Sequence, residues 1–409
     1  FWLKRSPYSG SVLPELGPVV WPRVGVPWVR RRRALEMIEY EEDWLYPILL
    51  RRDGSVFLRA VIFAVPSSAF GVLVLYTNDF DWSDGYQQEL RIADLKLSSL
   101  WKASIAVLAF LLSFRIAQAM ARFWEATTLL HQMRGEWFDT VSNCCTFSIA
   151  AKAAKPDEVQ RFRHTLCRMM SLAHGSALEE ISNNQVELAT IDSFGLDPDT
   201  INHLKVCFTD FGFNKVEMML HLIQSLIVQA HDDEVVVVPP PILSRVFQTI
   251  SRGFVCLLNA KKICDTKFPF PFAQLITFLL LMHCLLTPIM LSALIESKLL
   301  IAIIVLVPTL GVFSLNFIAV ELENPFGLDA NDLPLHTFQH EMNHCLIMLL
   351  HPNADTLATL RDDCEMDLDT LYRGVMDEHQ GRLSESLHEE PEKSEVEKSG
   401  DAVDGDTRQ

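Results

Sequence analysis

The chain has 409 residues, of which 49% are hydrophobic, and its formal net charge is −17 at pH 7. Its apolar residues are gathered in long blocks, which excludes an ordinary set of small soluble domains, and its acidic balance excludes nucleic acid as a partner. Nine cysteines without a Cys-x-x-Cys pair predict free thiols rather than a disulfide framework.

Four apolar runs are long enough to cross a bilayer, which takes about 20 residues. Residues 1–54 precede them as a partly irregular segment, in which Arg30 to Arg33 form a membrane-flanking anchor. The first span is predicted at 55–76. The second is predicted at 97–121, with an apolar part ending near Phe114 and a polar continuation beyond Arg115. The third and fourth, at 271–296 and 299–320, are joined by so short a link that they form an antiparallel hairpin.

The distribution of basic residues predicts the orientation of these spans. Lys and Arg lie before the first and third spans and after the second, whereas the link between the first two spans is acidic. By the positive-inside rule, both termini and the long middle region lie on the cytosolic side or its equivalent, such as the stroma.

The middle region, 122–270, is predicted to be a helical cytosolic or stromal domain. Helical periodicity covers 123–151, 157–180, 215–231 and 241–266, and Val235 to Val238 form an extended linker before three prolines. A C-terminal region, 321–376, begins with a turn and continues with helices at 334–350 and 354–373. An acidic, disordered tail occupies 377–409. The expected fold class is all-α, a multi-pass membrane protein.

The turn after the fourth span has the sequence Glu-Asn-Pro-Phe-Gly-Leu-Asp-Ala-Asn-Asp-Leu-Pro-Leu (323–335). Pro325 and Gly327 force a sharp change of direction. Asp332 is then placed to N-cap a helix that begins at Leu333, with Pro334 in its first turn.

Four segments in this order resemble the bestrophin family of anion channels, particularly its bacterial and chloroplast branch. They are the turn just described and three others: Ser-Phe-Arg-Ile-Ala-Gln-Ala-Met-Ala-Arg-Phe-Trp-Glu-Ala (113–126), Pro-Pro-Pro-Ile-Leu-Ser-Arg (239–245) and Phe-Pro-Phe-Pro-Phe-Ala-Gln-Leu (268–275). The resemblance covers roughly residues 53–373. It implies a homopentamer in membrane lipid around one central pore that passes small inorganic anions, with chloride as the permeant ion and bicarbonate as a second.

The resemblance also implies where the pore lies. Ala106, Phe110 and Phe114 of the second span would line an apolar neck, and Ile242 would form a narrower cytosolic aperture. Aromatic ring edges are partly positive and suit a weakly hydrated anion, and an apolar ring can gate by dewetting. Ala106 stands where a larger aliphatic residue is usual, so a wider upper neck is expected. Arg115 is either a pore-adjacent charge or a side chain that reaches the interface.

Animal members of the family bind calcium at the turn, where Asn324, Asp329 and Asp332 of this chain would be the ligands. Those members have a continuous acidic run there, whereas this chain has Asp-Ala-Asn-Asp. Calcium binding and helix capping are therefore both open interpretations of the same carboxylates.

A different function is predicted by His340-Glu-Met-Asn-His344, which fits the His-Glu-x-x-His signature of zinc proteases. Glu341 would be the general base, and Glu365 would supply a third ligand. A membrane zinc metalloprotease is therefore the alternative hypothesis, and a transporter or scaffold is a third. The leading hypothesis is a non-enzymatic anion channel.

The resemblance favours the chloroplast thylakoid membrane, with the plasma membrane as the alternative.

Overall fold

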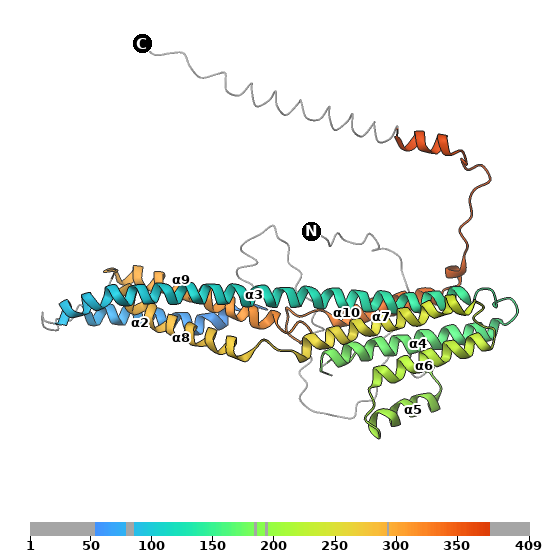
Figure 1. Cartoon of the computed structure of the whole chain (residues 1–409), viewed down its shortest axis with the longest axis horizontal. Coiled ribbons are helices and arrows are strands. Elements are labelled where there is room, and N and C mark those ends of the chain that lie inside the picture. The colour runs from blue at the N-terminus through green and yellow to red at the C-terminus, as the bar shows by residue number, and fades with distance from the viewer. Residues whose placement is uncertain (1–53, 79–85, 184–185, 193–194, 293, 377–409) are drawn as a thin grey trace, which may run out of the picture. The chain divides into compact units, whose positions relative to one another are not determined.

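The computed structural model describes residues 54–376 apart from 79–85, 184–185, 193–194 and 293. Most of the predicted segment 1–54, including the Arg30 to Arg33 run, and the tail 377–409 lie outside the described residues. The chain divides into two units, one ending at His351 and one beginning at Pro352. The regular elements of the described residues are all helical (Figure 1), which confirms the all-α class. All nine cysteines are free thiols.

Among the residues that the structure describes, four helices contain a stretch long and apolar enough to cross a membrane, as predicted. They are α2 (Phe57–Asn78), α3 (Tyr86–Phe147), α8 (Phe270–Ser292) and α9 (Lys298–Leu322). Three of them begin and end within four residues of the predicted spans. The fourth, α3, is much longer than the predicted 97–121, because no proline interrupts its 62 residues. At 1.5 Å per residue α3 is about 93 Å long, so it continues from the membrane part into the helical domain.

Two serines on α2 tie the membrane helices together. Pro288 within α8 has no backbone N–H, so the carbonyl of Cys284 one turn earlier lacks its usual helical donor. The hydroxyl of Ser67 donates to this carbonyl over 2.7 Å, and that of Ser68 donates to the carbonyl of Ala302 on α9 over 2.8 Å. These bonds satisfy backbone groups that water cannot reach in a bilayer.

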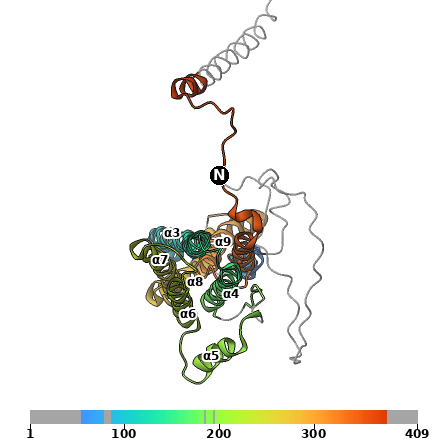
Figure 2. The ribbon, with the colours of Figure 1, turned by 90° about the vertical axis from the view of Figure 1, so that its right-hand side faces the viewer.

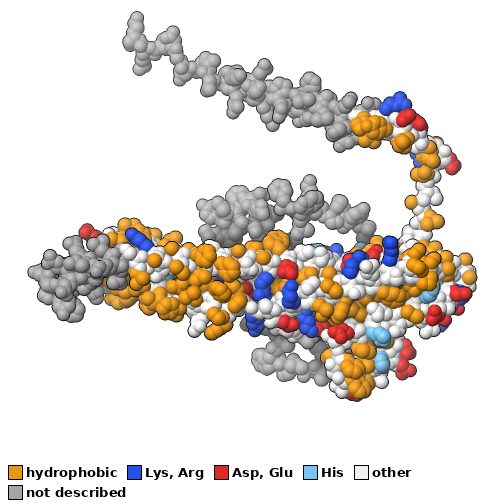
Figure 3. Space-filling view, viewed as in Figure 1, with side chains coloured by type: hydrophobic (Ala, Val, Ile, Leu, Met, Phe, Trp, Pro, Cys, Tyr) orange, Lys and Arg blue, Asp and Glu red, His pale blue; other side chains and the backbone are white. Residues whose placement is uncertain are grey.

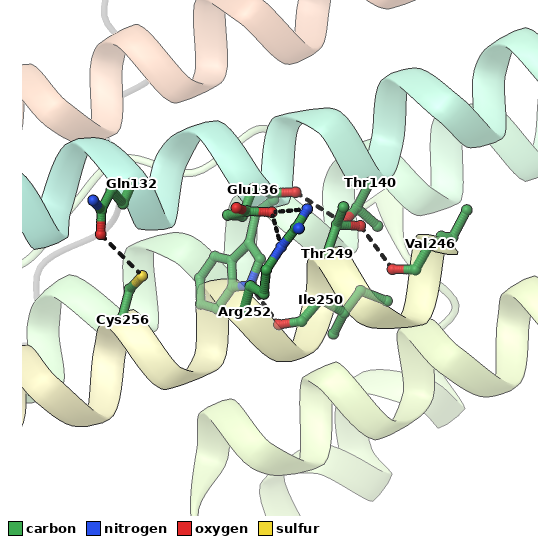
Figure 4. Close-up of polar contacts among 9 residues, drawn as sticks. Gln132, Glu136, Thr140, Val246, Thr249, Ile250, Arg252 and Cys256 are labelled. Carbon is green, nitrogen blue, oxygen red and sulfur yellow. Dashed lines mark hydrogen bonds and ion pairs between the residues drawn. The ribbon is translucent and has the colours of Figure 1, made fainter. Parts of the chain in front are cut away.

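The C-terminal part of α3 packs with α4 (Pro156–Ile181), α6 (Lys215–Asp232), α7 (Pro240–Asp265) and α10 (Leu335–Leu350) around one hydrophobic core. Figure 2 shows these helices end-on, side by side. Helix α7 runs antiparallel to α3, and polar contacts cross between them at regular intervals (Figure 4). The hydroxyls of Thr140 and Thr249 form a hydrogen bond over 2.8 Å, and Arg252 Nε donates to the carboxylate of Glu136 over 2.9 Å. This pairing fixes where the first turn of α7 lies along α3.

Two details of this domain concern the links between its helices. Val235 to Val238 contain neither helix nor strand, as predicted, and α7 begins at Pro240 with Pro239 as its N-cap. Helix α5 (Pro198–Thr209) was not predicted. It has only 12 residues and one buried side chain, Cys207, so its sequence lacks a continuous apolar stripe. Figures 1 and 2 both place α5 outside the main bundle, beyond α6.

In the unit that begins at Pro352, the predicted helix at 354–373 is wrong over most of its length. A short 3-10 turn, Pro352–Asp355, is followed by non-helical chain, and helix resumes only at 368–376. Asp367 explains the late start, because its carboxylate accepts hydrogen bonds from the backbone N–H and the hydroxyl of Thr370 over 3.0 and 2.6 Å. This is the geometry of an N-cap, which begins a helix rather than continuing one.

Candidate functional site

The membrane part of α3 has one packed face and one uncovered face. The packed face lies against α8 and α9, and its buried side chains are those of Leu108, Leu111 and Leu112. Ala106, Phe110 and Phe114 follow one another at intervals of four on the other face. Phe110 is 71% exposed and Phe114 40% exposed in the single chain. Figure 3 shows how much hydrophobic side-chain surface this half of the molecule leaves uncovered. These three residues are therefore available to face a pore axis, lipid or another subunit.

The ring of Phe114 has an aromatic neighbour within the chain. Its centroid lies 6.1 Å from that of Phe272 on α8, and the two planes are inclined by 40°. Phe272 is in turn 6.0 Å from Phe268, in the link before α8. This aromatic row restrains Phe114, while its exposed edge stays on the uncovered face of α3.

Arg115, the next residue, is turned the other way and is buried. Its Nε and Nη2 donate to the two carboxylate oxygens of Glu323 over 2.7 and 3.1 Å, and its Nη1 donates to Asn316 Oδ1 over 2.8 Å. Its guanidinium also lies 5.1 Å from the ring centroid of Phe268. The charge is therefore neutralised inside the subunit, by a bidentate pair. From the sequence alone, Arg115 was predicted to lie beside the pore or to reach the interface, and its pairing with Glu323 was not predicted.

Glu323 and Asn316 are thus the residues that sequence analysis missed at this site. Glu323 directly follows the last residue of α9, and Asn316 lies two turns earlier on the same helix. A carboxylate at the end of an otherwise apolar span is a signal for a basic partner, since an isolated charge near a bilayer is costly. Nothing in the sequence indicates which of the nearby arginines that partner is.

Ile242 lies in the first turn of α7, where its backbone N–H bonds to Pro239 O over 2.9 Å. Its side chain is 45% exposed, while the neighbouring Leu243 and Val246 are buried in the core. The antiparallel pairing with α3 sets this turn opposite the C-terminal end of α3, between the contacts at Phe147 and Thr140. At 1.5 Å per residue, the part of α3 that faces the Ile242 turn lies roughly 40–50 Å along the helix from Phe114.

The turn after α9 is held to the start of α2. Glu321 accepts hydrogen bonds from Arg59 over 2.9 Å and from the Asn331 side chain over 2.7 Å, and Asn331 also donates to Gly54 O. Asp332 is buried, and its carboxylate accepts the backbone N–H of Asp329 over 2.6 Å. The carboxylate of Asp332 lies against Gly327, where an added Cβ would come within 2.5 Å of it. The turn therefore needs glycine at this position.

The predicted N-capping role of Asp332 is wrong. Helix α10 begins at Leu335, with Pro334 as the N-cap and no side-chain cap bond. The carboxylate of Asp332 instead turns back into its own loop and satisfies a donor there. Burial raises its pKa to about 7, and the charges of Asp329 and Glu321 act in the same direction, against the lowering effect of the Asp329 N–H bond.

The same turn was predicted as a possible calcium site formed by Asn324, Asp329 and Asp332. Asn324 and Asp329 are exposed, and only the Asp332 carboxylate is buried. Across the described residues no three His, Cys, Asp or Glu side chains come together as a metal site. Calcium takes six to eight oxygen ligands, more than these three side chains supply, so calcium binding at this turn stays a prediction.

The raised pKa of Asp332 leads to a testable pH dependence. The folded protein keeps this proton up to about pH 7, whereas an unfolded aspartate loses it near 3.8. This site's contribution to stability therefore falls as the pH rises between those values. We expect Asp332→Asn, which cannot ionise, to reduce the drop in melting temperature between pH 5 and pH 8, while the exposed Asp139→Asn leaves the drop unchanged. An identical pH dependence in Asp332→Asn and the parent would contradict the assignment.

The His-Glu-x-x-His segment lies on α10, where His340 and His344 are both exposed. Glu341, the predicted base, forms an ion pair with Arg134 of α3. Glu365, the predicted third ligand, belongs to the unit that begins at Pro352 and accepts the backbone N–H of Asp367. A structural contact to α3 therefore explains Glu341, without a catalytic role.

Comparisons with known proteins agree with this geometry. The family model described as bacterial/fungal bestrophin protein matches residues 36–346. A curated relative, the voltage-dependent anion channel-forming protein of Synechocystis sp., is 24% identical over 296 residues, which are 70% of this chain and 86% of that protein.

Solved structures show the same fold at low sequence identity. A bacterial bestrophin homologue from Klebsiella pneumoniae has a TM-score of 0.55 and 18% identity, over 72% of this chain and 99% of that one. Another structure, described only as a membrane protein, has a TM-score of 0.56 and 16% identity, over 72% of this chain and 98% of that one.

Proposed function

The chain belongs to the bacterial and fungal bestrophin family, and on that premise we propose that its homopentamer is a passive channel for chloride and bicarbonate. The family is one of channels and not of enzymes, so the zinc protease hypothesis is set aside. The observation that carries the proposal is the uncovered face of α3. Five copies of this face around one axis would cover its apolar side chains and enclose a path for anions.

In the proposed assembly the path has two constrictions on one long helix. Ala106, Phe110 and Phe114 form an apolar neck within the membrane, and Ile242 forms the aperture at the cytosolic end of α3. An anion entering the neck meets ring edges rather than a fixed positive charge, since Arg115 is paired with Glu323. Weak binding of this kind lets an anion leave as readily as it enters.

The membrane is part of the proposal as well. The chain is an integral multi-pass membrane protein, and the resemblance to the chloroplast branch favours the thylakoid membrane over the plasma membrane. Fractionation of cells with an antibody to the chain would distinguish the two. Native mass spectrometry of the purified protein would test the pentamer, and a stable monomer that still conducts would contradict it.

Conduction is tested by reversal potentials of the purified protein in planar bilayers under chloride and bicarbonate gradients. We expect anion-selective currents, and expect Phe110→Ala and Phe114→Ala to change the permeability ratios or the gating without loss of assembly. Phe278→Ala is the matched control, because Phe278 is also an exposed ring in a membrane helix but lies on α8. If both α3 variants conduct and select like the parent, these rings do not line the path.

Ile242→Ala tests the aperture. The side chain is 45% exposed, so its truncation should change stability by less than about 1 kcal/mol. We expect the wider ring to relax discrimination between small and large anions, measured as permeability across a series of anion sizes. Ile347→Ala, an exposed isoleucine on α10, should leave this series unchanged. A loss of stability with unchanged permeability would remove Ile242 from the pore.

A further inference from the structure

A pocket of about 790 Å³ lies between α4, α5 and α6, away from the proposed path. Its volume is in the range of sites that hold small molecules, about 300–1,000 Å³. None of its lining residues belongs to α3 or α7. Most of its wall is apolar, formed by Leu172, Ile201, Leu204, Phe208, Phe213 and Met219.

One polar group in the wall of this pocket lacks a partner. Ser176 of α4 is only 5% exposed, and among the described residues its hydroxyl has no hydrogen-bond partner. Buried hydroxyls are nearly always hydrogen-bonded. The hydroxyl oxygen is enclosed, so a polar atom of an occupant can supply the missing partner once the Ser176 side chain turns toward the pocket.

The charged residues that line the pocket leave one positive charge uncompensated. Glu179 pairs with Lys215 over 3.6 Å, and Glu180 pairs with Lys261 and accepts the side chain of Asn214. Lys205 of α5 is exposed, and within the described residues no ion pair neutralises it. The unused polar groups are thus an ammonium and a hydroxyl, both able to donate, which favours a ligand group that only accepts.

Exposed aromatic rings line the pocket and lie next to it. Phe208 is 54% exposed and Phe213 is 50% exposed, and Phe213 stacks on Phe211, itself 65% exposed, with centroids 5.5 Å apart. Hydrophobic side chains gather over α5 in Figure 3. Clustered apolar surface of this kind marks a place where an apolar group is bound.

We propose that this pocket binds a medium-chain carboxylic acid. Its hydrocarbon chain lies among the apolar side chains of α4, α5 and α6, and its carboxylate accepts hydrogen bonds from Lys205 and, once its side chain turns toward the pocket, from Ser176. The apolar wall favours a ligand with a hydrocarbon chain, and the donors without partners favour a head group that accepts hydrogen bonds. Because α5 packs chiefly on α6, the occupant would also hold α5 against α4.

The test uses dodecanoate with a photoreactive diazirine at the end of its chain, applied to the full-length assembled protein in lipid nanodiscs. Labelled peptides are identified by mass spectrometry, so the position of binding is read directly and partition into lipid does not obscure it. We expect labels within 198–219 that unmodified dodecanoate displaces. Lys205→Glu should reduce this labelling about five- to tenfold, as reversal of one exposed charge contact allows.

Two controls make the result specific. Leu204→Trp, which fills the pocket, should abolish labelling at 198–219, whereas Lys267→Glu, an exposed lysine outside the pocket, should not change it. Labels confined to the membrane helices, labelling insensitive to Lys205→Glu, or equal labelling by the uncharged dodecanol analogue would each overturn the proposal. Labelling is measured without any ionic current. A failure of the protein to conduct anions would therefore leave the labelling result, and this proposal, unaffected.

Discussion

Arg115→Met should destabilise the protein by about 3–5 kcal/mol, because it leaves the largely buried carboxylate of Glu323 without its partner. The side chains of Arg115 and Glu323 are only 8% and 17% exposed, and three hydrogen bonds hold the guanidinium. These bonds join α3 to the end of α9 directly beside the proposed neck. The measurement is the melting temperature of the assembled protein, which we expect to be lower in Arg115→Met than in the parent.

Two further variants separate the ion pair from general damage. Arg252→Met removes an arginine that also contacts a carboxylate, Glu136, over 2.9 Å, but these two side chains are 55% and 27% exposed, so a loss of no more than about 1 kcal/mol is expected. The double variant Arg115→Met with Glu323→Leu should recover part of the lost stability, since neither charge is then left alone. If Arg115→Met is no more harmful than Arg252→Met, the pair does not hold α3 to α9.

The sequence predicts the spans well because their physical signal is local. Twenty apolar residues in a row are sufficient to identify a membrane helix, and all four were found within the described residues. The extent of α3 was underestimated for a related reason. Its apolar pattern ends near Phe114, but helix formation continues in polar sequence as long as no proline intervenes.

The contacts between distant segments could not be predicted in the same way. Arg115 and Glu323 are 208 residues apart, and their pairing depends on how α3 packs against α9. Asp332 had the right residue type and spacing for an N-cap, yet the turn used its carboxylate for the N–H of Asp329. Short-range rules describe what a side chain can do, and the tertiary packing decides which of those options is used.

Gly253→Ala should destabilise the protein by about 1–3 kcal/mol, although alanine is the better helix former. In the interior of a helix this substitution is ordinarily favourable by about 1 kcal/mol. Here an added Cβ would lie 2.3 Å from Nε1 and 2.4 Å from Cδ1 of Trp137, which is fully buried and donates its N–H to Ile250 O. A rigid indole in a packed core cannot move aside, so α7 must shift away from α3.

Gly135→Ala is the matched control, because Gly135 is also in the interior of a helix and an added Cβ there meets no atom within 4 Å. It should raise the melting temperature, whereas Gly253→Ala should lower it, and Trp137→Phe combined with Gly253→Ala should recover part of the loss. Because α7 carries Ile242, a shift of α7 should also change the permeability to large anions. Stabilisation by both glycine variants would mean that the α3–α7 interface tolerates an added methyl group, and that helix propensity alone decides the outcome.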